Sequence, residues 1–303
     1  KVHTQPTPLG GGLVVWAAVF FPLAFGVFVV RAFTADSLAA YLPLPATICH
    51  LMRTHFGGLQ QQSSDLLFLL SCSTLLTLLG LIDDYRGLNW QVRIIVQTVV
   101  AAVVVFGKGW KITFFIDLPF FTDLVSVLWI VGLINSFNML DNMDGLSAGV
   151  AAIASSMLAG VLLLAPTPEN NGPQLFVAGL LLVIVGALIG FLWHNRPIAK
   201  LFLGDAGSYL LGFLIAVASM LGTFAGGLLP KHAALAPLCI LAVPLYDTIT
   251  VVGIRIRNGR SPFEGDKNHF SHRLVYLGLT KLQAVLTIWL TTAACGLSSL
   301  VLY

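Results

Sequence analysis

Long apolar runs recur along this chain, and they restrict its fold more than any other feature. Nine runs approach the roughly 20 residues with which an α-helix crosses a bilayer. Only 10% of the residues are charged, against about 25% in a soluble domain. Spanning segments must satisfy their backbone hydrogen bonds internally. We therefore expect an all-α polytopic membrane protein with about nine transmembrane helices, which form a single integral-membrane domain over residues 1–303. The expected spans are Leu13–Val30, Leu66–Ile82, Val92–Phe106, Leu124–Phe137, Leu146–Ala165, Gln174–Trp193, Ser208–Leu228, Ala233–Ile254 and Leu282–Leu302.

Three segments outside the apolar runs add to this expectation. The chain opens on a polar stretch without a starting methionine or a signal sequence, so we expect a tenth span upstream of Lys1. Residues 31–64 are rich in turn-forming residues and predict a surface loop. Residues 108–123 alternate apolar and polar side chains around Pro119, which is typical of a small β-hairpin on the outer surface.

The basic residues divide unevenly between the two sides of these spans. Eleven of the sixteen fall on the side that holds the N-terminus. Basic loops favour the cytoplasmic side, so we expect a plasma-membrane protein with Lys1 inside and Tyr303 outside. The formal net charge is only +3 and the cations are dispersed, which argues against a nucleic-acid partner.

Acidic residues gather on this same cytoplasmic side, although the positive-inside rule does not require it. Carboxylates at the mouths of several spans indicate a metal or phosphate site there. The residues concerned are Asp83, Asp84, Asp141, Asp144, Asp205, Glu264 and Asp266.

The segment 135–146 carries amides and acids at a regular spacing. Asn138, Asp141 and Asp144 are three residues apart, so on a helical turn they would share one face. Such a face offers hard oxygen ligands, which suit Mg²⁺ beside phosphates. An ordinary polar loop with capping Asn and Asp residues is the alternative.

Two other acidic motifs end or begin a span. Asp83 and Asp84 close the second span, and adjacent carboxylates repel each other unless a cation or a shared proton intervenes. They suit a metal ligand or a base at the membrane surface, or simply a solvated loop. Asp205 lies between Gly204 and Gly207 and opens directly into a span, where it could hold Mg²⁺ against a diphosphate or cap the helix.

The longest cytoplasmic loop, residues 255–281, is also the most basic. Its cations and imidazoles suit a diphosphate or a nucleotide, whereas lipid headgroup contact is the alternative. Asp247 lies inside the preceding span, where an acid is costly. It could be functional, or it could be a hydrogen-bonded acid that holds the neighbouring loop. The loop side chains of interest are Arg255, Arg257, Arg260, Lys267, His269, His272 and Arg273.

Taken together in chain order, these motifs resemble the polyprenyl-phosphate N-acetylhexosamine-1-phosphate transferase family, over nearly the whole chain. Its members include enzymes that load UDP-GlcNAc onto undecaprenyl phosphate and the phospho-MurNAc-pentapeptide transferase. The motifs are Pro8-Leu9-Gly10-Gly11-Gly12, Asp83-Asp84, Asn138-x-x-Asp141-x-x-Asp144-Gly145-Leu146, Phe202-Leu203-Gly204-Asp205-x-Gly207-Ser208 and Asp266-Lys267-Asn268-His269-Phe270-Ser271-His272-Arg273.

This resemblance implies Mg²⁺-dependent transfer of a sugar-1-phosphate from a UDP-sugar to a polyprenyl phosphate, with release of UMP. Asp205 and Asn138 would hold the Mg²⁺, with Mn²⁺ as an alternative, and Asp83 or Asp84 would deprotonate or position the lipid phosphate. A homodimer is a possible assembly. The residues implied in binding the donor are Asp141, Asp144, Arg260, Lys267, His269, His272 and Arg273.

The chain departs from the family pattern at two positions. Ser271 stands where many members have a second histidine beside His272, which puts a specific role of His272 in doubt. Gly87 replaces a lysine that some members use near the lipid phosphate. The basic loop, with Arg260-Ser261-Pro262, resembles the UDP-GlcNAc group more than the pentapeptide group, which tends to carry three consecutive histidines. Donor identity therefore stays open between UDP-GlcNAc, another UDP-N-acetyl sugar and UDP-MurNAc-pentapeptide.

Two other classes compete with this interpretation. An ion-coupled secondary transporter would have acids at mid-membrane and paired broken spans, whereas most of the acids here lie outside the runs. A CDP-alcohol phosphotransferase would read Asp-Gly-x-x-Ala-Arg with further acids downstream. In this chain Asp144-Gly145 is followed by Leu146-Ser147-Ala148-Gly149, without the Arg or those acids.

Overall fold

The chain folds into helices along almost all of its described length. The computed structural model describes residues 7–41, 45–112, 118–164, 173–222 and 231–302, and within these ranges no strand occurs. The helices are α1 (Gly11–Ala32), α2 (Ala35–Tyr41), α3 (Ala46–Arg86), α4 (Trp90–Lys108), α5 (Pro119–Leu140), α6 (Leu146–Leu164), α7 (Leu175–Asn195), α8 (Gly204–Leu221), α9 (Ala236–Ile240), α10 (Ala242–Arg257), α11 (Phe270–Tyr276) and α12 (Lys281–Ser298), with 3-10 turns η1 (Lys231–Leu235) and η2 (Ser299–Leu302).

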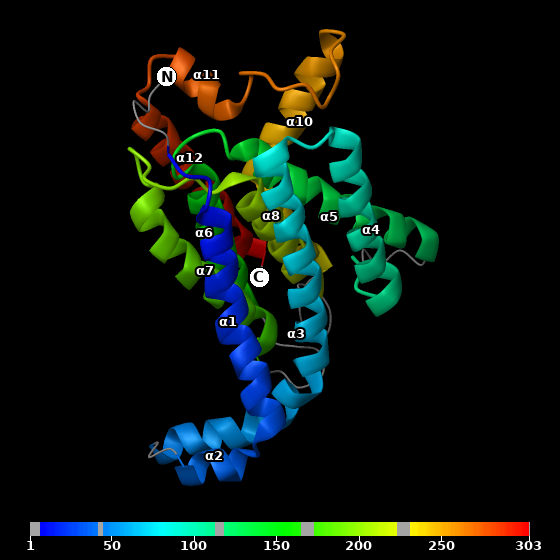
Figure 1. Ribbon diagram of the computed structural model, residues 1–303, viewed down its shortest axis with the longest axis vertical. Helices are drawn as coiled ribbons and strands as arrows, with labels where there is room; N and C mark the ends of the chain where they lie inside the picture. The colour runs from blue at the N-terminus through cyan, green and yellow to red at the C-terminus, as the bar shows by residue number, and fades with distance from the viewer. Residues whose placement is uncertain (1–6, 42–44, 113–117, 165–172, 223–230, 303) are drawn as a thin grey trace.

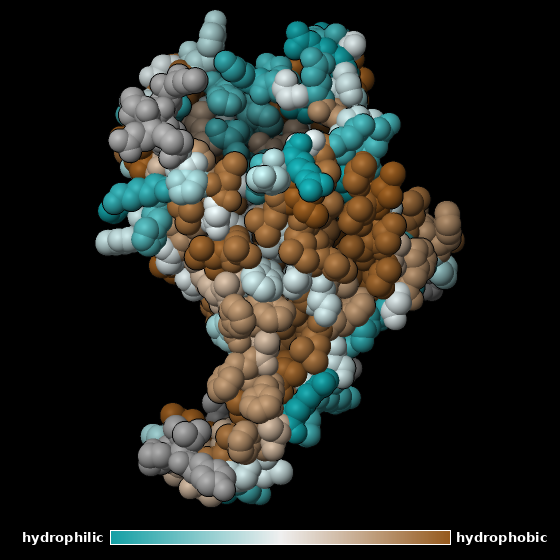
Figure 2. All heavy atoms as spheres, viewed as in Figure 1, coloured by the Kyte–Doolittle hydropathy of each residue, from teal (hydrophilic) through white to brown (hydrophobic). Residues whose placement is uncertain are grey.

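The expected membrane architecture is confirmed. In the described part of the chain, eight helices are long and apolar enough to cross a membrane, and the bent pair Lys231–Ile240 and Ala242–Arg257 would make a ninth. Figure 1 shows α1 and α3 side by side along the long axis, with α10 and α11 at one end and α2 at the other. On the face seen in Figure 2, apolar side chains dominate the middle, and the end with α10 and α11 is hydrophilic and hollowed.

Three details differ from the sequence-based expectation. Helix α3 has 41 residues, so at 1.5 Å per residue it is about twice as long as a bilayer core is thick. Within residues 31–64, where we expected a loop, α2 covers residues 35–41 and α3 begins at Ala46, while residues 42–44 lie outside the described ranges. The span expected at Ala233–Ile254 is bent by 67° between α9 and α10. The outer β-hairpin is not seen in the part of residues 108–123 that is described, because α5 begins at Pro119; residues 113–117 lie outside the described ranges.

Helix α8 lies at the centre of the helical assembly, and 83% of its residues are buried. It packs against α1, α3 and α5, and glycines allow its backbone to approach each of them closely. A Cβ added to Gly12 on α1 would lie 2.2 Å from Gly207 N, and one on Gly80 of α3 would lie 2.4 Å from Ala206 N. The first turn of α8 is therefore fixed in place by the two helices beside it.

We expect Gly80→Ala to destabilise the protein by about 1–3 kcal/mol, the usual range for an overpacked core. In an open helix the same change would stabilise, because alanine is the better helix former. Gly132→Ala on α5 is the matched control, since no heavy atom lies within 4 Å of its added Cβ. Thermal unfolding of both variants in detergent tests this, and an equal rise in both midpoints would contradict the close contact.

Candidate active site

Three helices bring acidic and amide side chains together at the hydrophilic end of the molecule. Asp84 lies at the end of α3, Asn138 at the end of α5 and Asp205 in the first turn of α8. Asn138 Nδ2 donates to Asp205 Oδ1 at 2.6 Å and to Ser208 Oγ at 3.1 Å. Residues far apart in sequence thus form one group, which together with Asp83 we call the acidic centre.

Asp84 holds the N-terminus of α8. Its two carboxylate oxygens accept hydrogen bonds from Asp205 N at 2.8 Å and Ala206 N at 3.2 Å. Gly204 makes this contact possible, because its φ is +71° and an added Cβ would lie 2.6 Å from Asp84 Oδ2. The positive end of the helix dipole adds to the attraction. Asp84 therefore fixes the position of the Asp205 backbone, from which the Asp205 side chain extends.

Asp83 is buried and fully engaged. Its Oδ1 accepts from Leu88 N at 2.7 Å, and its Oδ2 accepts from Tyr209 Oη at 2.7 Å and from Arg93 Nη1 at 3.1 Å. Its side chain is only 3% exposed, so the ion pair with Arg93 is shielded from water. These contacts orient the carboxylate from two other helices, α4 and α8.

Asp141 and Asp144 occupy the turn that follows α5. Burial raises the pKa of Asp141 to about 7, and the negative charge of Asp205 adds to the rise, although a hydrogen bond from the Gly204 backbone opposes it. Asp144 Oδ2 accepts from Ala199 N at 3.1 Å, so it contacts the loop between α7 and α8. The two acids therefore have different surroundings. Asp141 lies near the other carboxylates, and Asp144 accepts a hydrogen bond from the loop between α7 and α8.

Asn195, which sequence reasoning missed, connects two segments of the candidate site. It is 3% exposed, its Oδ1 accepts from Gly145 N at 2.9 Å, and its Nδ2 donates to Leu201 O at 2.8 Å. It therefore joins the turn after α5 to the segment that leads into α8. The turn carries Asp141 and Asp144, and the segment leads directly to Asp205 in the first turn of α8, so Asn195 helps to hold these acids at a fixed separation.

The basic loop is built on a buried ionic framework. Asp247, which is fully buried, accepts from Phe270 N at 2.6 Å and lies 2.8 Å from His269 Nδ1. Arg255 donates to Asp266 Oδ1 at 3.1 Å and to Pro262 O at 2.6 Å. Asp247 is thus a hydrogen-bonded acid that holds the neighbouring loop, one of its two predicted readings.

Two groups in this loop titrate away from their ordinary range. Burial alone would raise the pKa of Asp266, but hydrogen bonds from Arg255 and Asn268 outweigh it and lower the pKa to about 2. Burial lowers the pKa of His272, and the nearby His269 and basic side chains lower it further. At neutral pH Asp266 is therefore ionised, and His272 is neutral.

The predicted donor-binding residues of the loop fall into two groups. Arg260 and Lys267 are exposed, whereas His269 is only 6% exposed and is engaged with Asp247. Arg273 Nη2 lies 3.3 Å from Tyr246 Oη, beside α10. The loop also reaches the turn after α5, because Ser271 Oγ donates to Asn142 Oδ1 at 2.6 Å.

The chemistry of the acidic centre suits a hard cation. Its donors are carboxylate and amide oxygens, and the nearby Asp141 has a pKa that is raised first by burial and then by the negative charges of Asp205, Asp84 and Asp144. Among the described residues, no three His, Cys, Asp or Glu side chains form a ready metal cage. Mg²⁺ does not need one, because it commonly takes one or two carboxylates and completes its shell with waters and substrate phosphates.

Comparison with known proteins decides the family. A model described as glycosyl transferase family 4 matches residues 66–223. This chain is also 31% identical, over 312 residues, to a probable undecaprenyl-phosphate N-acetylglucosaminyl 1-phosphate transferase of Bacillus subtilis, with 100% of this chain and 75% of that protein covered. The chain belongs to glycosyl transferase family 4. The resemblance drawn from the sequence motifs is thereby confirmed.

Other family 4 relatives extend the comparison. A decaprenyl-phosphate N-acetylglucosaminephosphotransferase of Mycolicibacterium smegmatis is 31% identical over 328 residues, covering 100% of this chain and 74% of that protein. The undecaprenyl-phosphate alpha-N-acetylglucosaminyl 1-phosphate transferase of Escherichia coli K12 is 30% identical over 240 residues, covering 74% and 62%. The family 4 match at residues 66–223 includes the whole acidic centre and ends before the basic loop.

Proposed function

We propose that this chain transfers GlcNAc-1-phosphate from UDP-GlcNAc to a polyprenyl phosphate. An oxygen of the lipid phosphate forms a bond to the β-phosphorus, the bond from that phosphorus to the bridging oxygen breaks, and UMP leaves. The observation that carries the proposal is the junction of Asp84, Asn138 and Asp205 at the hydrophilic end of a membrane-embedded helical assembly. The names of the full-length relatives supply the donor and acceptor classes.

We propose further that Asp205 and Asn138 would hold Mg²⁺, with Mn²⁺ as an alternative. When bound, the cation would neutralise charge on the diphosphate, on which phosphoryl transfer depends. The hydrogen bond from Asn138 to Asp205 supports this pairing, since it brings an amide and a carboxylate from two helices to one point. The amide oxygen of Asn138 would be the ligand, because an amide nitrogen does not coordinate Mg²⁺. The side-chain amide would turn to present that oxygen to the cation.

Asp83 and Asp84 are the candidates that deprotonate or position the lipid phosphate. Asp83→Asn and Asp84→Asn should differ in kcat if only one of them is the base. Asp84→Asn should also loosen the N-terminus of α8, because an amide nitrogen cannot accept from a backbone N–H. Turnover and thermal unfolding of each variant separate these effects, and equal mild losses of turnover would argue that neither acid is a base.

The donor would lie between the acidic centre and the basic loop. Asp141 and Asp144 would shape the nucleotide site, while Arg260, Lys267, His272 and Arg273 would cover the diphosphate and sugar. His269 would act mainly by fixing the loop, in view of its bond to Asp247. We place this face in the cytoplasm, on the distribution of basic residues, and treat the whole chain as one transferase domain. The mass of the detergent-solubilised protein tests the expected homodimer.

The test is a radiolabel assay on purified protein with undecaprenyl phosphate and labelled UDP-GlcNAc, with and without Mg²⁺. Mg²⁺-dependent label in the lipid phase, together with released UMP, is the expected result. Parallel arms contain other UDP-N-acetyl sugars and UDP-MurNAc-pentapeptide. Label from one of these alone would replace UDP-GlcNAc as the donor, and no label in any arm would overturn the transferase proposal.

The pKa of Asp141 predicts how Mg²⁺ dependence changes with pH. Its value of about 7 means that below pH 7 Asp141, which lies beside the proposed cation site, carries a proton. A divalent cation bound at that site would lower the pKa of Asp141 and so release this proton. The Mg²⁺ concentration that gives half-maximal turnover should therefore fall as pH rises from 6 to 8, by up to about tenfold per unit below pH 7. Asp141→Asn should flatten this pH dependence. The same slope in the variant would show that Asp141 is not the group that releases the proton.

A further inference from the structure

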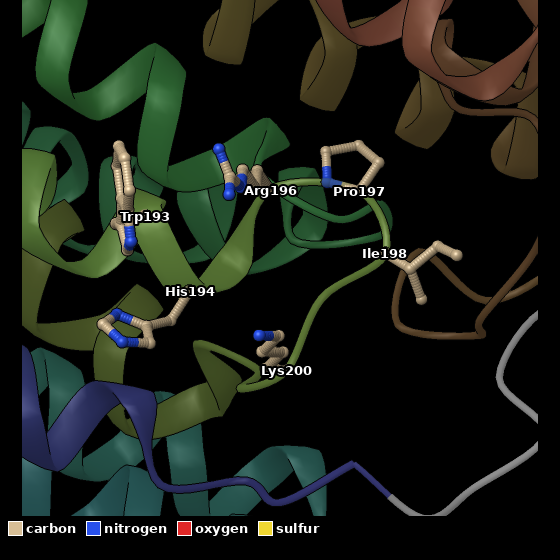
Figure 3. A pocket seen from close by; sticks show the side chains of 6 residues that line it. All are labelled: Trp193, His194, Arg196, Pro197, Ile198 and Lys200. Atoms are coloured by element: carbon tan, nitrogen blue, oxygen red, sulfur yellow. The ribbon is translucent and has the colours of Figure 1, made fainter.

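A small basic pocket lies at the end of α7, in the loop that leads to α8. Its volume is about 110 Å³, and Figure 3 shows Trp193 and His194 on one side of it and Pro197 and Ile198 on the other. Among the described residues, no acidic side chain lines it. The lining residues are Trp193, His194, Arg196, Pro197, Ile198 and Lys200.

The two cations of this pocket are Arg196 and Lys200. Within the described ranges, neither Arg196 nor Lys200 forms an ion pair. The Arg196 guanidinium lies 4.7 Å from the ring centroid of Trp193. Such stacking holds a guanidinium in place while its N–H donors remain available to an anion. The pocket therefore suits the binding of a negatively charged group.

An exposed apolar face of α7 leads directly to the pocket. Leu182, Ile189 and Trp193 are 50%, 63% and 68% exposed, and their spacing places them on one side of the helix. Gly186 and Gly190 lie on the same side, and no heavy atom lies within 4 Å of a Cβ added to either. The face therefore forms a shallow apolar track that ends at Arg196 and Lys200.

A ligand that fits both features has an apolar chain and an anionic head. We propose that the pocket binds the phosphate of an anionic bilayer phospholipid, whose acyl chains lie along the exposed face of α7. A bilayer lipid is favoured over the polyprenyl phosphate acceptor, because in the described structure no lining side chain hydrogen-bonds to the acidic centre. Basic and aromatic side chains side by side are typical of a membrane–water interface.

This pocket also has a route to the proposed active site. In the same loop, Ala199 N donates a hydrogen bond to Asp144 Oδ2 at 3.1 Å. The loop then continues through Leu203 into Gly204 and Asp205. A phospholipid held by Arg196 and Lys200 would therefore stabilise the segment that positions α8. Its loss would loosen that loop without removing any residue of the acidic centre.

The test is native mass spectrometry of delipidated protein titrated with phosphatidylglycerol or phosphatidylcholine. The first phosphatidylglycerol should bind about 25-fold more weakly to the Arg196→Gln/Lys200→Gln double variant, at about fivefold per cation. Phosphatidylcholine binding should not change. Arg257→Gln is the matched control, because Arg257 is an exposed cation at the end of another helix and does not line the pocket.

Single Lys200→Gln, with about a fivefold effect, keeps the test decisive if the double variant does not fold. A third arm uses undecaprenyl phosphate in place of phosphatidylglycerol. Stronger pocket-dependent binding of that lipid would overturn the phospholipid assignment in favour of the acceptor. Equal losses in the double variant and Arg257→Gln would overturn the site altogether. All three lipid arms measure binding and none measures turnover, so the proposed function can fail while this proposal holds.

Discussion

Replacing Asp205 by asparagine should abolish turnover while the protein still folds. The substitution removes the charge of the proposed cation ligand but keeps the size of a side chain whose own Oδ1 already accepts from Asn138. Removing one group that stabilises transition-state charge typically costs about 10²–10³ in kcat, and we expect at least that loss. The measurement is the radiolabel assay over a range of Mg²⁺ concentrations, because added Mg²⁺ should not restore the variant.

The control for this prediction is Asp123→Asn. Asp123 also carries a partner within reach, Lys111 Nζ at 3.2 Å, but it lies near the start of α5, at the far end of that helix from Asn138. It should keep normal turnover. Thermal unfolding of both variants in detergent shows whether the fold is retained. Near-normal turnover in Asp205→Asn would remove this residue from the metal site.

Most of the membrane architecture could be predicted because run length and apolarity are local properties. Each expected span lies largely within a helix or, at Ala233–Ile254, within the bent pair. The bend had a signal that we did not use. Pro244 has no N–H to donate to the carbonyl of Ile240, which disfavours a continuous helix at this point, and α10 begins at Ala242, two residues before the proline. The length of α3 had no such signal, since residues 53–65 within it are mostly polar and include Gly57 and Gly58.

The candidate site could be predicted only in part, for the same physical reason. Acids at the mouths of spans stand out in an apolar sequence, and the structure brings Asn138, Asp84 and Asp205 together; their roles stay predictions. Arg93 and Tyr209 carry no local signal. Tyr209 reaches Asp83 from 126 positions away, and only the packing of α8 against α3 creates that contact.

The second large effect concerns Asp247, which we expect to be a positioning residue. As long as His269 keeps its proton on Nδ1, Asp247→Asn leaves one buried donor without an acceptor, because the amide nitrogen would face either His269 Nδ1 or Phe270 N. An unsatisfied buried group costs about 1–3 kcal/mol, and it should release α11 and the basic loop. Since small misplacements can cost about 10²-fold, kcat/KM for the donor should fall about 10- to 100-fold, mostly through KM.

A second readout separates this role from a purely chemical one. Arg260 and Lys267 lie exposed on the loop, so trypsin should cleave there faster in Asp247→Asn than in the wild type. Asp65→Asn is the control, because Asp65 bonds Lys108 at 2.6 Å on a side chain that is 41% exposed, where an ion pair contributes little. Unchanged cleavage and unchanged KM in Asp247→Asn would show that the loop does not depend on this acid. Faster cleavage with unchanged KM would instead show that the loop is held by Asp247 but does not contact the donor.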